Sequence, residues 1–280
     1  MSATHARKKP FLRLATAAVA MVAALGMAAC SGGASTSSSS SSSAQVGDRS
    51  PEQIKEAGEI VIGIFSDKAP FGYIDADGKP AGYDVVYGDR IAADLGVTAK
   101  YVPVDAAART EVLASNKVDI TLANFTVTPE RAEKVDFANP YFKVSLGVVS
   151  PSSAEITDVG QLAGKTLIVT KGTTAEAYFE ANHPEVKLQK YDQYSDAYQA
   201  LEDGRGDAFS TDNTEVIAWA IAHPGFSVGI KSLGETSYIA AAVKKGNAPL
   251  LDWLNNQLTE LGEENFFHKD YEQTLAPVYG

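Results

Sequence analysis

The chain has 280 residues, a formal net charge of −11 at pH 7 and a single cysteine, Cys30. The acidic charge argues against nucleic acid as a partner, and one cysteine excludes an internal disulfide. The sequence contains no metal-ligand spacing, no nucleophile motif and no Walker-type phosphate loop, so we expect neither a metal nor a cofactor.

Residues 1–29 are typical of an export signal. A basic start is followed by a run of Ala, Val, Leu and Met that is short for a membrane span. Small residues precede Cys30, as in a bacterial lipobox, although Met27 stands where Leu is usual. We therefore predict lipid on Cys30, with an incidental thiol as the alternative, and a Ser-rich tether over residues 30–49.

The residues after the tether alternate between strand and helix patterns. The expected elements are a helix over 51–57, a strand over 59–65, a hairpin turn at 77–78, a helix over 84–95, a strand over 98–104, a helix over 106–115 and a strand over 118–122. This alternation indicates a mainly parallel α/β sheet. Ligands on such sheets bind at the carboxyl ends of strands, where residues 66–71 and 124–131 lie.

The turn and helix after residue 122 form a candidate anion site. Thr128 and the proline that follows it predict the start of a helix. Side chains in a helix lean toward its N-terminus, so Arg131 would lie over Asn124 and Thr126. A guanidinium, a hydroxyl and free N–H groups would then converge on one anion. The alternative is a surface arginine that pairs with a neighbouring glutamate.

A second series of elements follows Pro151 and indicates a second lobe. It comprises a helix near 157–163, a strand over 165–170, a helix over 175–181, a strand over 186–192, a helix over 195–202, a strand over 207–211, a helix over 213–223, a strand over 237–243 and a helix over 248–261. Apolar runs near 144–149 and 237–243 predict two hinge strands.

Two turns in this second series are candidate ligand contacts. Gly172 frees the backbone, and Thr173 or Thr174 caps the next helix, so this turn is either a second anion cradle or a plain helix cap. Asp212 follows the strand over 207–211 and either caps the next helix or faces a cleft.

Four segments carry a family resemblance: GYDVVYGDRIAADLG, LANFTVTPERAEKVDFANPY, KGTTAEAYF and GRGDAFSTDNT. Together they resemble the bacterial extracellular solute-binding proteins of family 3, the amino-acid receptors of ABC importers, over about residues 50–280. The resemblance implies a two-lobed, type II periplasmic-binding-protein-like clamp in the α/β class. Each lobe would be a mainly parallel sheet flanked by helices, one formed by 50–144 and 240–280 and the other by 145–239. Val86 departs from the usual acidic residue after the GYD motif.

The resemblance also implies roles for the candidate residues. Arg131 would pair with the α-carboxylate of an amino acid and Asp212 with its α-ammonium. The predicted ligand-binding set is Lys68, Phe71, Asn124, Phe125, Thr126, Arg131, Gly172, Thr173, Thr174 and Asp212. Lys68 stands where several relatives place an aromatic over the ligand side chain. If it faces inward it disfavours arginine and suits an acidic side chain or a thiol, and the alternative is that it reaches solvent.

The amino-acid sequences of these segments look closest to the branch of the family that binds cysteine. Cysteine or cystine is therefore the expected ligand, and glutamate or aspartate is the alternative. An exported dehydratase on this fold would need a general acid, and we find no candidate besides Asp212. A wall lyase would need a further domain and a sensor a transmembrane segment. We therefore expect a monomeric receptor, not an enzyme, on the outer face of the cytoplasmic membrane. It would serve the permease and ATPase subunits of an importer.

Overall fold

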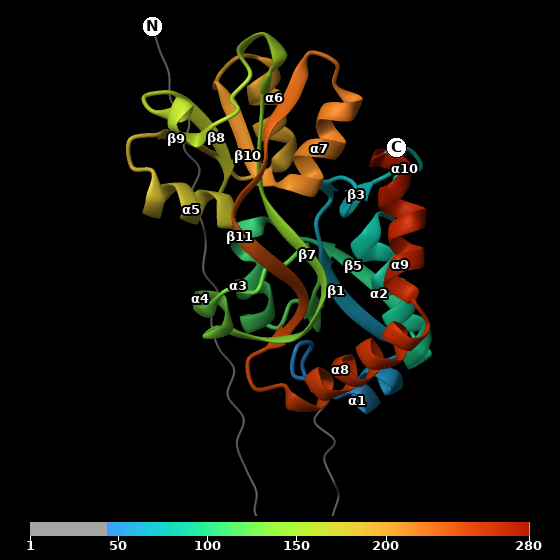
Figure 1. Cartoon of the computed structure of the whole chain (residues 1–280). Coiled ribbons are helices and arrows are strands. Elements are labelled where there is room, and N and C mark those ends of the chain that lie inside the picture. The colour runs from blue at the N-terminus through green and yellow to red at the C-terminus, as the bar shows by residue number, and fades with distance from the viewer. Residues whose placement is uncertain (1–43, 280) are drawn as a thin grey trace, which may run out of the picture. The chain divides into compact units, whose positions relative to one another are not determined.

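The computed structural model describes residues 44–279 (Figure 1). The predicted export signal, Cys30 and the Ser-rich run up to residue 43 lie outside the described residues. Within the described part, no helix combines the length and the apolar character needed to cross a membrane.

Helices and strands alternate along the chain as predicted. The first series is α1 Pro51–Ala57, β1 Glu59–Ile64, β2 Asp67–Lys68, β3 Gly72–Ile74, β4 Pro80–Ala81, α2 Tyr83–Leu95, β5 Thr98–Pro103, α3 Arg109–Ala114, β6 Ile120–Thr121, α4 Pro129–Ala132 and β7 Val135–Pro151. The second is β8 Thr166–Thr170, α5 Thr174–Asn182, β9 Lys187–Tyr191, α6 Tyr194–Glu202, β10 Ala208–Asp212, α7 Asn213–Ala222, β11 Phe226–Lys244, α8 Ala248–Glu263, α9 Phe266–Asp270 and α10 Ala276–Tyr279.

One eight-stranded sheet with the order β5-β1-β6-β11-β7-β10-β8-β9 connects these elements. β1 is parallel to β5 and β6 in one half, and β8 is parallel to β9 and β10 in the other. The long strands β7 and β11 pair antiparallel from Pro151 opposite Phe226 to Val135 opposite Lys244, and they run side by side between the halves (Figure 1). This is the predicted two-lobed α/β architecture, with two long strands linking the lobes.

Alternation along β1 shows how the sequence builds the core. Ile60, Ile62 and Ile64 belong to a cluster that includes the buried face of α2, whereas Val61 and Phe65 belong to a second cluster. A third cluster joins β8 to α5 in the other half. Because both faces of β1 are covered by apolar side chains, the strand is nearly continuously apolar, as parallel strands usually are.

Several predicted elements are shorter or differ in type. The expected helix over 106–115 is a 3₁₀ turn, Ala106–Ala108, followed by α3. The expected helix near 157–163 is a 3₁₀ turn, Val159–Leu162, with glycine in its middle and another glycine two residues after its end. Glycine favours irregular backbone over helix, which explains this difference.

The folded unit begins before residue 50. The buried carboxylate of Asp119 accepts hydrogen bonds from the backbone N–H of Gly47 at 3.0 Å and from Nε of Arg49 at 2.9 Å. The same carboxylate accepts from the N–H of Val61 in β1 at 2.8 Å. Residues 47–49, which the prediction assigned to the tether, are therefore attached to the sheet.

Candidate ligand-binding site

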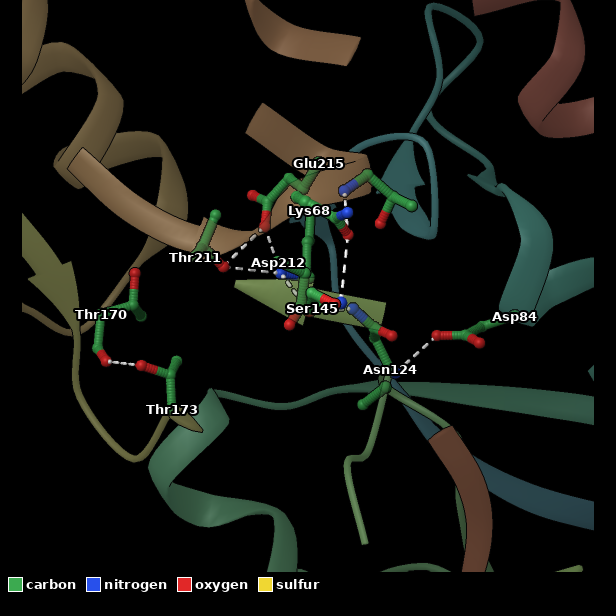
Figure 2. Close-up of polar contacts among 12 residues, drawn as sticks. Lys68, Asp84, Asn124, Ser145, Thr170, Thr173, Thr211, Asp212 and Glu215 are labelled. Carbon is green, nitrogen blue, oxygen red and sulfur yellow. Dashed lines mark hydrogen bonds and ion pairs between the residues drawn. The ribbon is translucent and has the colours of Figure 1, made fainter. Parts of the chain in front are cut away.

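The turn after β6 holds its backbone in an unusual conformation. Ala123 and Asn124 have φ angles of 39° and 42°, in the left-handed region that most side chains avoid. Asp84, at the start of α2, accepts from the N–H of Asn124 at 2.7 Å and from the hydroxyl of Tyr141 at 2.6 Å. Burial raises the pKa of Asp84 to about 6, against the effect of these two bonds. Asp84 thus fixes the turn that presents Asn124 (Figure 2).

Two arginines surround this turn. Arg131 lies where it was predicted, because its Nη1 donates to the carbonyl of Thr126 at 2.8 Å. Its Nη2 donates to the carbonyl of Gly172 at 2.8 Å. Arg109, the first residue of α3, was not predicted, yet it is buried and donates to the carbonyls of Asn124 and Gly172 at 3.1 Å each. Two guanidinium groups therefore meet one carbonyl oxygen.

Phe125 lies against both cations. Its ring centroid is 4.5 Å from Cζ of Arg109 and 5.2 Å from Cζ of Arg131, within the range of cation–π contacts. Burial and the neighbouring charge of Arg131 lower the pKa of Arg109 to about 9, so Arg109 stays protonated at pH 7. Burial also lowers the pKa of Arg131. Two adjacent cations, Arg109 buried and Arg131 half-buried, whose side-chain bonds go to neutral carbonyls, make this a favourable place for an anion.

The turn at Gly172 places the N-terminus of α5 beside the two arginines. Gly172 has φ of +72°, and a Cβ there would lie 2.4 Å from Cα of Ala107, so only glycine allows this approach. Thr173 is the N-cap of α5, since its Oγ1 accepts from the N–H of Glu176 at 3.2 Å. Thr174 opens the helix, and its N–H has no acceptor within the helix. The turn therefore caps α5 and can also bind an anion, so the structure is compatible with both alternatives.

Asp212 faces the opposite half of the sheet rather than its own helix. It is the N-cap residue of α7 but makes no side-chain capping bond. Its carboxylate accepts from Nδ2 of Asn124 at 2.7 Å and lies 3.5 Å from Nζ of Lys68. Of the two alternatives left by the sequence, the cleft-facing one is therefore the observed one.

Lys68 points inward and not to solvent. Its side chain is 1% exposed, and its ammonium is ion-paired with Glu215 and donates to Oγ1 of Thr211 at 3.2 Å (Figure 2). Burial lowers the pKa of Lys68, but the carboxylates of Glu215 and Asp212 outweigh it and raise that pKa above its ordinary value. The charge is thus already matched, which removes the basis of the argument for an acidic ligand side chain.

Phe71 was expected at the ligand and lies elsewhere. Its ring is fully buried in the core, 5.6 Å from the ring of Phe142 and 6.2 Å from that of Tyr83. The apolar face of α2 therefore attracts this side chain more strongly than the polar cleft.

Five of the remaining predicted residues, Asn124, Thr126, Thr173, Thr174 and Asp212, line a small cavity of about 10 Å³, whereas Phe125, Arg131 and Gly172 line only the pocket beside it. The lining residues of this cavity come from both halves of the sheet and are Arg109, Asn124, Thr126, Thr173, Thr174, Tyr194, Thr211 and Asp212. A pocket of about 540 Å³ adjoins it, shares Thr173 and Thr174, and is also lined by Arg131 and Phe125. The inner cavity holds no more than a water, so an amino acid would enter by separation of the two halves.

Sequence reasoning missed Arg109, Tyr194, Thr211 and Glu215 at this site. Thr211 lies at the carboxyl end of β10, and Tyr194 opens α6 after β9, so both lie at the binding edge and position alone could have found them. Arg109 and Glu215 lie in the first turns of helices, where charged residues are common, and no sequence signal distinguishes them from surface residues.

Comparisons with known proteins identify the family and agree with the two-lobed fold. The family model described as bacterial extracellular solute-binding proteins, family 3, matches residues 60–275. A solved solute receptor for L-cysteine from Neisseria gonorrhoeae is 51% identical, with a TM-score of 0.81 over 83% of this chain and 96% of that one. A cysteine-binding protein from Campylobacter jejuni is also 51% identical, with a TM-score of 0.80 over 82% and 94%. The L-cystine-binding protein TcyJ of Escherichia coli (strain K12) is 27% identical over 76% of this chain and 80% of its own length.

Proposed function

The chain belongs to the bacterial extracellular solute-binding proteins of family 3, and we propose that it is the cysteine receptor of its importer. At the coarser level it is an amino-acid-binding protein of the ABC-transporter type, and its family and close structural relatives are binding proteins. Cysteine as the ligand and lipid on Cys30 as the anchor are our proposals.

The observation that carries an amino-acid ligand is the placement of opposite charges around one cavity. Arg109 lines the inner cavity and Arg131 lines the adjoining pocket, and both donate to the carbonyl of Gly172. Asp212 lines the inner cavity from the other half of the sheet. An α-carboxylate beside the arginines, with donors from Thr126 and Thr174, and an α-ammonium beside Asp212 would satisfy both. Closure of the halves would then require both ligand charges.

The energetics suit a reversible carrier. Three or four charge-assisted hydrogen bonds contribute roughly 1.5–3 kcal/mol each. After the costs of ordering and closure, binding near −8 kcal/mol, which is about micromolar, is a reasonable net value. Nothing in this balance calls for a chemical step.

Cysteine is favoured over the other candidates by relatives and by charge. The solute receptor from Neisseria gonorrhoeae and the binding protein from Campylobacter jejuni, each 51% identical, both carry cysteine in their names. Lys68 is matched by Glu215, so a neutral side chain suits the site better than the carboxylate of glutamate or aspartate. Cystine is the second candidate, supported by the cystine-binding relative from Escherichia coli.

The proposed cellular setting follows from the sequence. Lipid on Cys30 would hold a monomeric clamp on the outer face of the cytoplasmic membrane, where it passes ligand to the permease and ATPase subunits. We assign residues 50–144 and 240–280 to one lobe and 145–239 to the other.

Calorimetry against the twenty amino acids, with cysteine kept reduced, tests the proposal, and the ligand is analysed afterwards. We expect cysteine to bind in the low-micromolar range or tighter and to be recovered unchanged. Tighter binding of glutamate would overturn the choice of ligand but leave the receptor standing. A consumed ligand would replace the receptor with an enzyme of the dehydratase kind.

A further inference from the structure

The ammonium of Lys68 sits between two carboxylates that belong to consecutive elements. It forms an ion pair with Glu215 on α7 and lies 3.5 Å from Asp212 at the end of β10. Thr211 bonds both Lys68 Nζ and Glu215, the latter at 2.9 Å, and the ring of Tyr194 lies 4.0 Å from Nζ. Figure 2 shows Lys68 reaching across to this group.

This arrangement creates a competition for Asp212. The proposed ligand brings an ammonium to Asp212, and Lys68 already carries an ammonium to within 3.5 Å of it. A lysine with Asp212 as its only carboxylate partner would form a closed intramolecular pair, and the ligand would have to break it. Glu215 offers Lys68 a second carboxylate, and the Lys68–Glu215 contact is the shorter of the two.

We propose that Glu215 is a positioning residue that holds Lys68 off Asp212 and so keeps Asp212 available to the ammonium of the ligand. The inference rests on the proposed amino-acid ligand and adds a residue that determines specificity. Glu215 is fully buried and absent from the cavity lining, so it acts through Lys68 and not by touching the ligand. The bonds from Thr211 and Lys68 favour its ionised form, although burial raises its pKa to about 7.

The balance of positive and negative groups around the cavity explains how Glu215 would affect the choice between neutral and acidic ligands. Apart from the exposed Glu130, which acts on Arg131, the charged groups that act on one another around the cavity are the cations Lys68, Arg109 and Arg131 and the buried carboxylates Asp84, Asp212 and Glu215. Equal numbers of each suit a zwitterion without net charge, because a net charge on a buried ligand would stay uncompensated. Without Glu215 the region gains one positive charge, which favours a ligand with an acidic side chain.

The alternative is that the Lys68–Glu215 pair only fastens β2 to α7. In that case its removal would lower the melting temperature of the ligand-free protein and weaken all ligands by the same factor. Removing Lys68 in addition would then recover nothing.

The experiment measures the dissociation constants of reduced L-cysteine and of L-aspartate for the parent, Glu215→Gln, Lys68→Met and the double variant. Glu235→Gln, an exposed carboxylate on β11, is the control for the loss of one charge. We expect Glu215→Gln to weaken cysteine at least tenfold and to raise the affinity for aspartate relative to cysteine at least tenfold. The double variant should regain most of the lost cysteine affinity.

Glu215→Gln binding cysteine like the parent, or a double variant no better than Glu215→Gln, would overturn the inference while the receptor stands. If Glu215→Gln does not fold, the comparison is between Lys68→Met and the double variant. Because Glu215 is proposed to act only through Lys68, these two should bind cysteine equally. Tenfold weaker binding by the double variant would refute that role. A parent that binds no amino acid refutes the proposed receptor and this inference with it.

Discussion

Replacing Asp212 with asparagine tests the proposed ammonium contact with little change of shape. The residue Asp212 is 6% exposed, and the bond that its carboxylate accepts from Nδ2 of Asn124 can be kept by the new amide oxygen. An ammonium about 3 Å from a carboxylate gains roughly 5 kcal/mol at an effective dielectric constant of about 20. Lys68 at 3.5 Å already offsets part of the field of Asp212, so we expect a net loss nearer the low end of the range for broken buried charge pairs.

We therefore expect Asp212→Asn to weaken cysteine binding by about 2–3 kcal/mol, which is roughly 30- to 150-fold. The melting temperature of the ligand-free protein should change little, because Lys68 keeps Glu215 as its partner. Calorimetry gives the affinity, and thermal unfolding gives the stability. Asp252→Asn, on the exposed side of α8, is the control. Binding within threefold of the parent would show that Asp212 does not hold the ammonium.

Further substitutions separate binding, stability and location. Arg131→Ala should weaken cysteine binding by about 2–5 kcal/mol in calorimetry, since a desolvated carboxylate loses its cation; parent-like binding would contradict this. Arg109→Met should lower the free energy of unfolding without ligand by about 2–5 kcal/mol, because buried carbonyls lose their donors, and an unchanged denaturation curve would refute it. Burial raises the pKa of Asp270 to about 8, so the parent loses stability as pH rises from about 4 to about 8. Asp270→Asn should therefore raise the melting temperature more at pH 9 than at pH 5, and an equal shift at both would count against the buried charge. Cys30→Ser in the native host should move the protein from the membrane fraction to the soluble one, and its retention there would argue against lipid on Cys30.

The fold was predictable where the signals are local. In α2 the apolar residues Tyr83, Tyr87, Ile91 and Leu95 recur every fourth position, and all four are buried. Gly96 ends the helix with φ of 71°, as its position predicted. Such patterns act within one or two turns, so the sequence carries them directly. By contrast, β6 and α4 are short because their lengths depend on the strands packed around them, which no local pattern records.

The site was predictable only where a motif or an element boundary carries it. Arg131 and Asp212 follow from helix and strand ends. The partnership of Lys68 with Glu215 joins residues 147 positions apart, and it exists only after β2 and α7 meet. Phe71 is a case in which position misled the prediction. Its place in the loop suggested a ligand contact, but its ring packs against the aromatic side chains of the neighbouring core.

The two arginines also explain why a site so rich in charge can bind reversibly. Both donate to the carbonyl of Gly172, from the opposite half of the sheet, and Arg131 bonds the carbonyl of Thr126 as well. A ligand carboxylate therefore exchanges neutral acceptors for a charged one and does not add bonds to empty donors. A bond exchanged in this way gains less than a charged bond formed by a donor that had no partner, which keeps the affinity moderate. Arg109 also donates to the carbonyls of Ala123 and Asn124, and Arg131 donates to that of Thr126, all in the same half as the arginines. Release of the ligand on separation of the halves therefore leaves neither guanidinium without a partner.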